Sequence, residues 1–177
     1  MAWGAMRYNL GSVAWIRRDK WRHIVEDLRT GDLSRRKAYA LSHQFRVDNP
    51  GSCMGPAYYT KLIFFAAPPA GNGYSGSSGY IMDQWTSLSI YLLFGTDSGP
   101  LIDLSSSEYR GRRTDTVTDR NTPEIYEIFC QKIEFLADRL GISPEAVEER
   151  LFSVGGQRPG AWRKYVKENR PPRRRKH

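Results

Sequence analysis

Apolar residues recur at helical spacing in seven segments of this chain, and turn-forming residues separate the segments. We expect helices at about 13–28, 34–46, 56–67, 84–94, 122–140, 143–154 and 160–168. None of the segments shows the period-two alternation of a strand, and residues 95–121, which are polar, are expected to form a loop with a short helical turn. The pattern therefore predicts an all-α fold.

Length and charge indicate one domain with an anionic partner. The chain has 177 residues, 40% of them apolar, which suits a compact single domain. Lys and Arg number 27 against 19 Asp and Glu, so the net charge of +8 favours nucleic acid or an anionic membrane surface. Because cations crowd the end of the chain, we expect a helical body at 1–162 and a basic tail at 163–177. The tail is either an electrostatic arm or a disordered, solubilising terminus.

Two further features argue against whole classes of protein. Cys53 and Cys130 share no ligand spacing, so neither a metal site nor a disulfide scaffold is predicted. Met1–Leu10 lacks the apolar core of a signal peptide, and no segment reaches the roughly 18 apolar residues of a membrane span. We expect a cytoplasmic protein that uses no metal and no other cofactor.

The segment from Cys53 to Leu93 carries the most informative chemistry. Gly55 and Pro56 open a helix whose first amides lack partners, so a phosphate could bind at this turn. Lys61 lies in the same apolar, aromatic helix, where burial would lower its pKa toward a neutral amine that can attack a sugar C1′. The same lysine could instead reach the surface or pair with an acid.

Asp83 stands directly before the apolar helix at 84–94, at the position of an N-cap. Backbone amides and the helix dipole would keep its carboxylate ionised. Cleavage of an N-glycosidic bond makes the sugar oxocarbenium-like, and a fixed negative charge beside the sugar stabilises that state. Capping and catalysis are compatible roles for Asp83.

These motifs resemble the helix-hairpin-helix DNA glycosylase superfamily, in particular bacterial proteins of the 8-oxoguanine glycosylase fold. The resemblance rests on GPAYYTKLIFFA, on YIMDQWTSLSIYLL and on the segment from Tyr126 to Gly155, and it covers about residues 50–155. It implies a hairpin that binds the DNA backbone and a catalytic segment, together at about 48–94. It also implies Lys61 as the family's lysine, Asp83 as its aspartate, and a monomer that flips a modified base out of double-stranded DNA.

Two departures from the family pattern concern Lys61. It lies six residues beyond Gly55, about one helical turn later than expected, and four residues along a helix return to nearly the same face. The Gly/Ser-rich loop at 70–79 lengthens the separation of Lys61 and Asp83 to twenty-two positions. Lys61 therefore either forms a Schiff base, which would add abasic-site lyase activity, or is structural in an enzyme that activates water.

Other residues are expected to contact DNA or the flipped base. Three cations in the first turn of the helix at 34–46 oppose its dipole and are expected to meet phosphates: Arg35, Arg36 and Lys37. Aromatic residues that could line a base pocket, or equally belong to the core, are Trp15, Trp21, Tyr59, Phe65, Trp85 and Phe152. Gln44 or Asn49 could fill the gap that a flipped base leaves.

The excised base has two candidates. Oxidised guanine would indicate DNA repair. A hypermodified phage base such as glucosylated hydroxymethylcytosine would indicate antiviral defence, and a flexible loop at 70–79 could admit so bulky a base.

Two other functions compete with base excision. The segment LADRLGISPEAVEERLF has the spacing of a helix-turn-helix transcription regulator, although Glu145, Glu148 and Glu149 on its second helix would repel phosphates. A non-catalytic DNA-binding module would keep the hairpin and bind DNA without releasing a base.

Overall fold

A computed structural model describes residues 18–49, 54–67, 78–95, 101–109, 111–153 and 159–171 of the chain. Within these ranges it contains seven helices and a two-stranded sheet. The helices are α2 (Arg18–Thr30), α3 (Arg35–Asp48), α4 (Pro56–Ala66), α5 (Gln84–Phe94), α6 (Pro123–Leu140), α7 (Pro144–Phe152) and α8 (Ala161–Glu168). The predicted all-α class is confirmed, with one local exception in the sheet.

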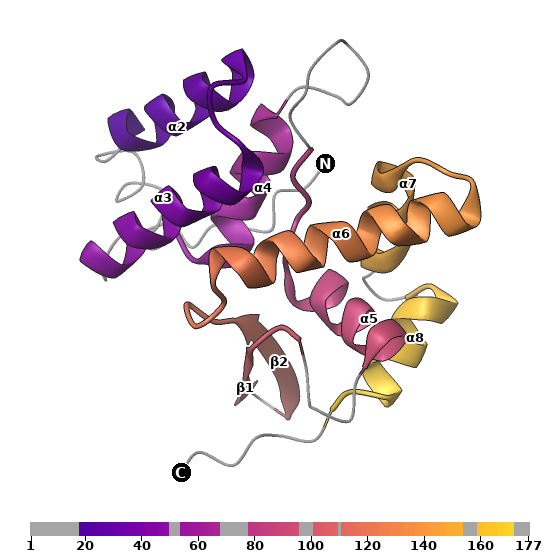
Figure 1. Cartoon of the computed structure of the whole chain (residues 1–177). Coiled ribbons are helices and arrows are strands. Elements are labelled where there is room, and N and C mark those ends of the chain that lie inside the picture. The colour runs from indigo at the N-terminus through magenta and orange to yellow at the C-terminus, as the bar shows by residue number, and fades with distance from the viewer. Residues whose placement is uncertain are drawn as a thin grey trace.

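Helix α6 runs through the middle of the molecule and separates two groups of helices (Figure 1). Helices α2, α3 and α4 pack together on one side, and α5, α7 and α8 pack together on the other. Both α3 and α7 contact α6, which buries Tyr126, Phe129 and Ile133. A single core of apolar side chains therefore extends through both groups.

Helix ends follow from local sequence chemistry. Ser34, Thr122 and Ser143 each accept a hydrogen bond from a first-turn amide of the helix that they precede. Gly141 ends α6 with a φ of 63°, a left-handed conformation in which a Cβ would be strained. These ends lie where the sequence predicts them, because each depends only on residues close in the chain.

The described residues between 95 and 121 do not form the predicted loop with a helical turn. Instead β1 (Leu104–Tyr109) pairs antiparallel with β2 (Arg112–Val117), and Leu104 lies opposite Val117. The inward positions of β2 include Val117 and Asp115, both buried. A carboxylate at an inward position interrupts the apolar alternation by which a strand is identified in sequence, and this explains the wrong prediction.

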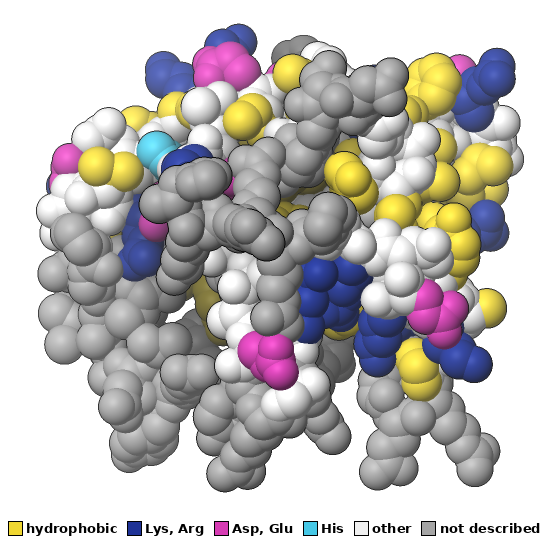
Figure 2. Space-filling model, turned by 90° about the horizontal axis from the view of Figure 1, so that it is seen from below, with side chains coloured by type: hydrophobic (Ala, Val, Ile, Leu, Met, Phe, Trp, Pro, Cys, Tyr) yellow, Lys and Arg dark blue, Asp and Glu magenta, His cyan; other side chains and the backbone are white. Residues whose placement is uncertain are grey.

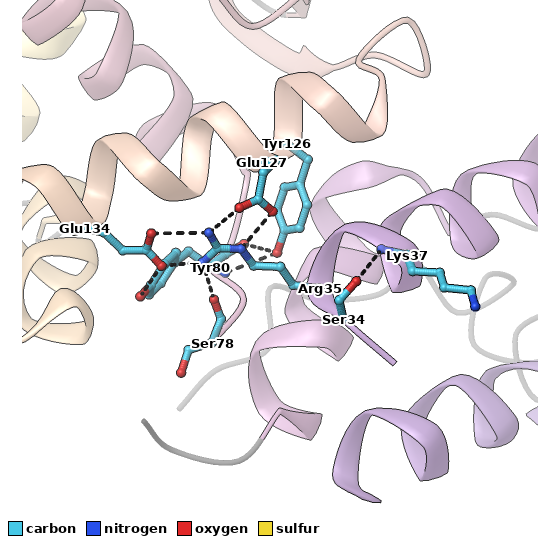
Figure 3. A network of polar contacts seen from close by, with 8 residues as sticks. All are labelled: Ser34, Arg35, Lys37, Ser78, Tyr80, Tyr126, Glu127 and Glu134. Atoms are coloured by element: carbon cyan, nitrogen blue, oxygen red, sulfur yellow. Dashed lines mark hydrogen bonds and ion pairs between the residues drawn. The ribbon is translucent and has the colours of Figure 1, made fainter. Parts of the chain in front are cut away.

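Arg35 joins α3 to α6 through a buried ion-pair cluster (Figure 3). Its side chain is 3% exposed and pairs with Glu127 and Glu134 of α6. Burial disfavours the charge of Arg35, but the hydrogen bonds to Glu127 and Glu134 outweigh burial and raise its pKa. The cation at the start of α3 is thus compensated by carboxylates of α6, and Arg35 has no exposed surface to offer a phosphate.

Between α4 and α5 the chain runs through a clamped segment, residues 78–83, outside any helix or strand. Buried backbone groups in such a segment need hydrogen-bond partners. Side chains supply them: Arg35 donates to Ser78 O, the Tyr126 hydroxyl bonds Tyr80 N and O, Glu148 accepts from Ile81 N, Thr60 accepts from Met82 N, and the Thr86 hydroxyl bonds Ile81 O and Asp83 N. Five helices, α3 to α7, therefore hold this segment at once.

The clamped segment is closely packed at Gly79. A Cβ at this position would overlap Cγ2 of Ile63 and lie 2.9 Å from the Tyr126 hydroxyl. We expect Gly79→Ala to lower the free energy of unfolding by about 1–3 kcal/mol, because a close-packed core does not absorb an added methyl group. Urea denaturation measures the change.

Gly55→Ala is the matched control, because nothing lies within 4 Å of the Cβ that it would add. We expect a smaller loss, on the order of 0.5 kcal/mol, because Gly55 is the N-cap of α4 and Ala is a poorer N-cap than Gly. Equal stabilities of the two variants would contradict close packing at Gly79.

Candidate active site

Asp83 is the N-cap of α5, as its place in the sequence predicts. Its Oδ1 accepts hydrogen bonds from the amides of Trp85 at 2.7 Å and Thr86 at 3.1 Å. The Asp83 amide in turn donates to the Thr86 hydroxyl at 3.1 Å, which completes a capping box. Oδ2 accepts no hydrogen bond from the described residues, so this oxygen is available to a ligand.

The groups around Asp83 shift the pKa of its carboxyl in opposite directions. Asp83 is 9% exposed, and burial raises the pKa of its carboxyl. The amides of Thr86 and Trp85 lower this pKa, and so do the positive charges of Lys61 and Arg163. Burial is the largest of these influences, whereas the sequence predicts only the influence of the cap. The α5 amides, and after them the two cations, therefore oppose the effect of burial on the Asp83 carboxyl.

Lys61 of α4 lies within electrostatic range of Asp83, although twenty-two positions separate them in the chain. The structural link is its neighbour Thr60, whose hydroxyl accepts a hydrogen bond from the Met82 amide at 3.1 Å. The Lys61 side chain is half-buried, and its Nζ lies 5.6 Å from the centroid of the Tyr58 ring. The fold thus brings together the two residues that the sequence marks as candidate catalytic groups.

Glu148 adds a second buried carboxyl to this region. Helix α7 turns it inward, where it accepts a hydrogen bond from the Ile81 amide. Burial raises the pKa of Glu148 to about 8, with the Ile81 amide acting against this shift and the charge of Asp83 adding to it. At neutral pH Glu148 is therefore mostly protonated. Its hydrogen bond from the Ile81 amide fixes the clamped segment two residues before Asp83.

Trp85 follows Asp83 by two residues, and cations from the C-terminal part of the chain lie near its ring. The Arg163 Cζ is 3.8 Å from the ring centroid, the Arg170 Cζ is 5.0 Å away and the Lys167 Nζ is 5.9 Å away. The sequence assigns Arg163 to a basic tail. In the structure it is a buried residue of α8, and α8 packs against α5 and α7.

The β1–β2 hairpin is joined to the C-terminal segment beside this site. Asp115 pairs with Arg113 at 2.9 Å and with Arg170 at 3.1 Å. Gln84, the first residue of α5, accepts a hydrogen bond from the Asp115 amide at 3.3 Å. Figure 2 shows basic side chains gathered beside the hairpin and over α8 on this face of the molecule. The hairpin thus links the start of α5 to the basic C-terminal segment.

The aromatic residues expected in a base pocket lie in different surroundings. Tyr59 and Trp21 are in the core, where the Tyr59 ring packs edge-on against Tyr39 with centroids 5.0 Å apart. Phe65 and Phe152 are exposed, and the Arg163 Cζ lies 4.8 Å from the centroid of the Phe152 ring. Trp15 lies outside the described residues.

The candidate gap-filling residues are bonded within their own segment. The Gln44 side chain donates to Asp48 at 2.8 Å, and the Asn49 side chain donates to the Phe45 carbonyl at 3.0 Å. Both side chains therefore bond to residues of their own segment, and neither of these hydrogen bonds is to Asp83.

The candidate phosphate-binding residues are divided between interior and surface. Arg35 is interior, Arg36 pairs with Glu124 at 2.6 Å at an exposed position, and Lys37 is exposed and points away from the Arg35 cluster (Figure 3). Gly55 is the N-cap of α4 and Pro56 its first residue. Residues 50–53 of the expected hairpin turn lie outside the described residues.

Of the two site residues that the predictions omit, one has a signal in the sequence and the other has none. Arg163 stands three positions before the buried Val166, on one face of a helix, so an amphipathic reading of α8 indicates its burial. Glu148 has no comparable signal, because an inward carboxylate in an apolar stripe cannot be distinguished from a surface one by pattern alone.

Neither a cluster of metal-binding side chains nor a membrane-spanning helix is found in the part of the chain that the structure describes. No three His, Cys, Asp or Glu side chains there are grouped to hold a metal ion. No helix there combines the length and the apolar character needed to cross a membrane.

A protein-family model matches most of the chain. Residues 1–152 match the family described as "Putative 8-oxoguanine DNA glycosylase OGG-like protein". No curated protein and no solved structure matches the chain. Helix α8 lies beyond the matched residues, so the match includes Asp83, Lys61 and Glu148 and leaves out Arg163.

The raised pKa of Glu148 predicts a loss of stability with rising pH. Between its ordinary value of 4.5 and about 8, the folded protein keeps a proton that the unfolded chain has lost. Stability therefore falls as pH rises through this window, by at most about 1.4 kcal/mol per pH unit from this group. We expect Glu148→Gln to flatten the pH dependence of the unfolding free energy in this window, measured by urea denaturation.

The neighbouring exposed residue provides the control for this measurement. Glu149→Gln removes a carboxylate from the same helix at a solvent-facing position, and we expect it to keep the wild-type slope. A Glu148→Gln variant with the wild-type slope would show that Glu148 ionises normally in the folded protein.

Proposed function

The chain belongs to the OGG-like family of DNA glycosylases, and we propose that it excises a modified base from double-stranded DNA with Asp83 as the catalytic carboxylate. The observation that carries this proposal is the buried N-cap Asp83, with Oδ1 bonded to the α5 amides and Oδ2 accepting no bond from described residues. Such a carboxylate is held rigidly while one oxygen stays available to a sugar.

The proposed reaction begins with base flipping, because an enzyme cannot reach C1′ of a stacked nucleotide inside the duplex. The N-glycosidic bond then breaks, its electron pair leaves with the base, and the sugar becomes oxocarbenium-like. The Asp83 carboxylate stabilises this positive charge. A nucleophile adds to C1′, and Asp83 is placed to accept the proton that the nucleophile loses.

Lys61 is the nucleophile that we propose for this step. Its position within electrostatic range of Asp83 supports this role, since the carboxylate could accept the proton that the amine loses when it adds to C1′. After the base has left, the amine adds to C1′ of the oxocarbenium-like sugar, and opening of the C1′–O4′ bond then gives a Schiff base, which would give the enzyme abasic-site lyase activity. Water activated by Asp83 is the alternative nucleophile, and Lys61 would then be structural.

We propose that exposed residues of the site region contact the DNA. Arg36 and Lys37 at the start of α3 and the Gly55–Pro56 turn remain candidates for phosphate contact, whereas the buried Arg35 does not. Of the aromatic candidates that the structure describes, Phe65 and Phe152 are exposed, and they are the ones that we propose for contact with a flipped base. The ring of Trp85 instead contacts Arg163.

A transcription regulator fits the structure less well. Helix α7, the recognition helix of that alternative, buries Val147, Glu148 and Leu151. It leaves Glu145 and Glu149 exposed, and two carboxylates would be repelled by DNA phosphates.

Oxidised guanine is the base that we propose first, since the family description names 8-oxoguanine. A hypermodified phage base such as glucosylated hydroxymethylcytosine is the second candidate. What supports the second candidate is the Gly/Ser-rich sequence of residues 70–79, which leads directly into the clamped segment before Asp83 and lacks bulky side chains apart from Tyr74.

Asp83→Asn tests the catalytic carboxylate. Asn also caps helices well, so the variant is expected to fold and bind DNA, but without a negative charge it should release bases at least about 100-fold more slowly. Mass spectrometry of the bases released from oxidised DNA and from glucosylated phage DNA measures the rate and identifies the base.

Asp138→Asn, which changes an exposed carboxylate on α6, is the control and should keep wild-type activity. Full activity of Asp83→Asn would exclude the proposed role of Asp83. Wild-type protein that binds both DNAs and releases no base would indicate a non-catalytic binding module.

Lys61→Ala tests the nucleophile by borohydride trapping. Borohydride reduces a Schiff base to a stable amine, so we expect a covalent protein–DNA complex with the wild type and none with Lys61→Ala. Lys132→Ala is the control, because this lysine also lies on an aromatic ring, with Nζ 4.8 Å from the centroid of Phe94. Base release without any trapped complex would assign the attack to water.

A further inference from the structure

We propose that α8 is part of the active site and that its residue Arg163 holds Asp83 in the anionic form. Helix α8 lies outside the residues that match the family, so this contribution belongs to the chain's own C-terminal segment. The functional consequence rests on the proposed catalytic role of Asp83. Arg163 is a positioning residue in this proposal, because it acts on the reaction through Asp83.

The position of Arg163 is fixed from two sides. Its guanidinium lies against the ring of Trp85, with Cζ 3.8 Å from the centroid, and it donates hydrogen bonds to the Phe152 and Ser153 carbonyls at the end of α7. The Trp85 amide in turn donates to Asp83 Oδ1 at 2.7 Å. One side chain, only 4% exposed, thus connects the end of α7 to Trp85, whose amide is capped by Asp83.

The charge of Arg163 is not cancelled by an ion pair. Its hydrogen bonds go to neutral carbonyls, its Nε is buried without a hydrogen-bond partner, and no carboxylate pairs with it among the described residues. Burial lowers the pKa of Arg163, and the negative charge of Asp83 is the influence that raises it. Because an arginine stays protonated even so, its buried positive charge acts on Asp83.

The other groups around Asp83 come from three further elements. Lys61 of α4 adds a positive charge, whereas Glu148 of α7 is an acid whose negative charge would oppose that of Asp83. The first turn of α5 contains no charged residue. On β2, the carboxylate of Asp115 is already paired with Arg113 and Arg170. Arg163 is therefore one of two cations that counteract the burial of Asp83.

Lys167 provides a close comparison with Arg163. It lies on the same helix and near the same ring, with Nζ 5.9 Å from the Trp85 centroid, but it is exposed, so water screens its charge. Removal of either residue takes one positive charge from α8. Only the removal of Arg163 should change the ionisation of Asp83.

The experiment is an NMR titration of the Asp83 carboxyl carbon in the DNA-free protein, with its signal assigned by its loss in Asp83→Asn. We expect Arg163→Gln to raise the titration midpoint by about one pH unit, a tenfold change in the ionisation constant. Arg163→Lys, which keeps the charge, and Lys167→Gln should both titrate close to the wild type. Arg163→Met keeps an apolar stem on Trp85 and replaces Arg163→Gln if that variant does not fold.

The pH profile of base release gives the functional readout. The acid limb of the profile should move to higher pH in Arg163→Gln by the same amount as the NMR midpoint, and Arg163→Lys should restore it. An unchanged Asp83 midpoint in both charge-free variants would overturn the inference, even if their activity were lost. A shifted midpoint together with a fully active Asp83→Asn would instead overturn the proposed function and leave the Arg163–Asp83 interaction standing.

Discussion

The buried backbone of residues 78–83 must find hydrogen-bond partners, and the way in which it finds them organises the whole molecule. A helix satisfies its own amides and carbonyls, but this segment lies outside any helix or strand. Arg35, Tyr126, Glu148, Thr60 and Thr86 supply the missing partners from five different helices. The two helix groups on either side of α6 are thereby joined at one place, and the segment ends on Asp83.

The same constraint explains why the candidate site is so strongly polar inside a small core. Each side chain that bonds the segment brings its own charge or hydroxyl into the interior. Glu148 avoids the free-energy cost of a buried charge by keeping its proton near neutral pH. Asp83 cannot also keep its proton, because in the proposed mechanism only its anion stabilises an oxocarbenium-like sugar. The α5 amides and the cations of α4 and α8 oppose its burial, and this is the role in the site that we propose for the C-terminal helix.

The chemistry that this arrangement supports agrees with the family. A glycosylase needs a rigid anion beside the sugar, a nucleophile in reach of C1′ and a positively charged surface for the duplex. We propose the N-cap Asp83, the half-buried Lys61 and the basic side chains beside the hairpin and over α8 (Figure 2) for these three needs. Buried Arg35 serves the fold instead, because the carboxylates of α6 already pair with the guanidinium that would otherwise bind a DNA phosphate.

The sequence by itself determined the helices, their ends at Ser34, Thr122 and Gly141, and the capping position of Asp83, because each depends on residues a few positions apart. Tertiary structure alone decided that β2 forms around a buried Asp115, that Glu148 turns inward, and that Lys61 comes within electrostatic range of Asp83. Those outcomes depend on partners far apart in the chain. A polar residue looks the same in sequence whether water or another element of the fold satisfies it.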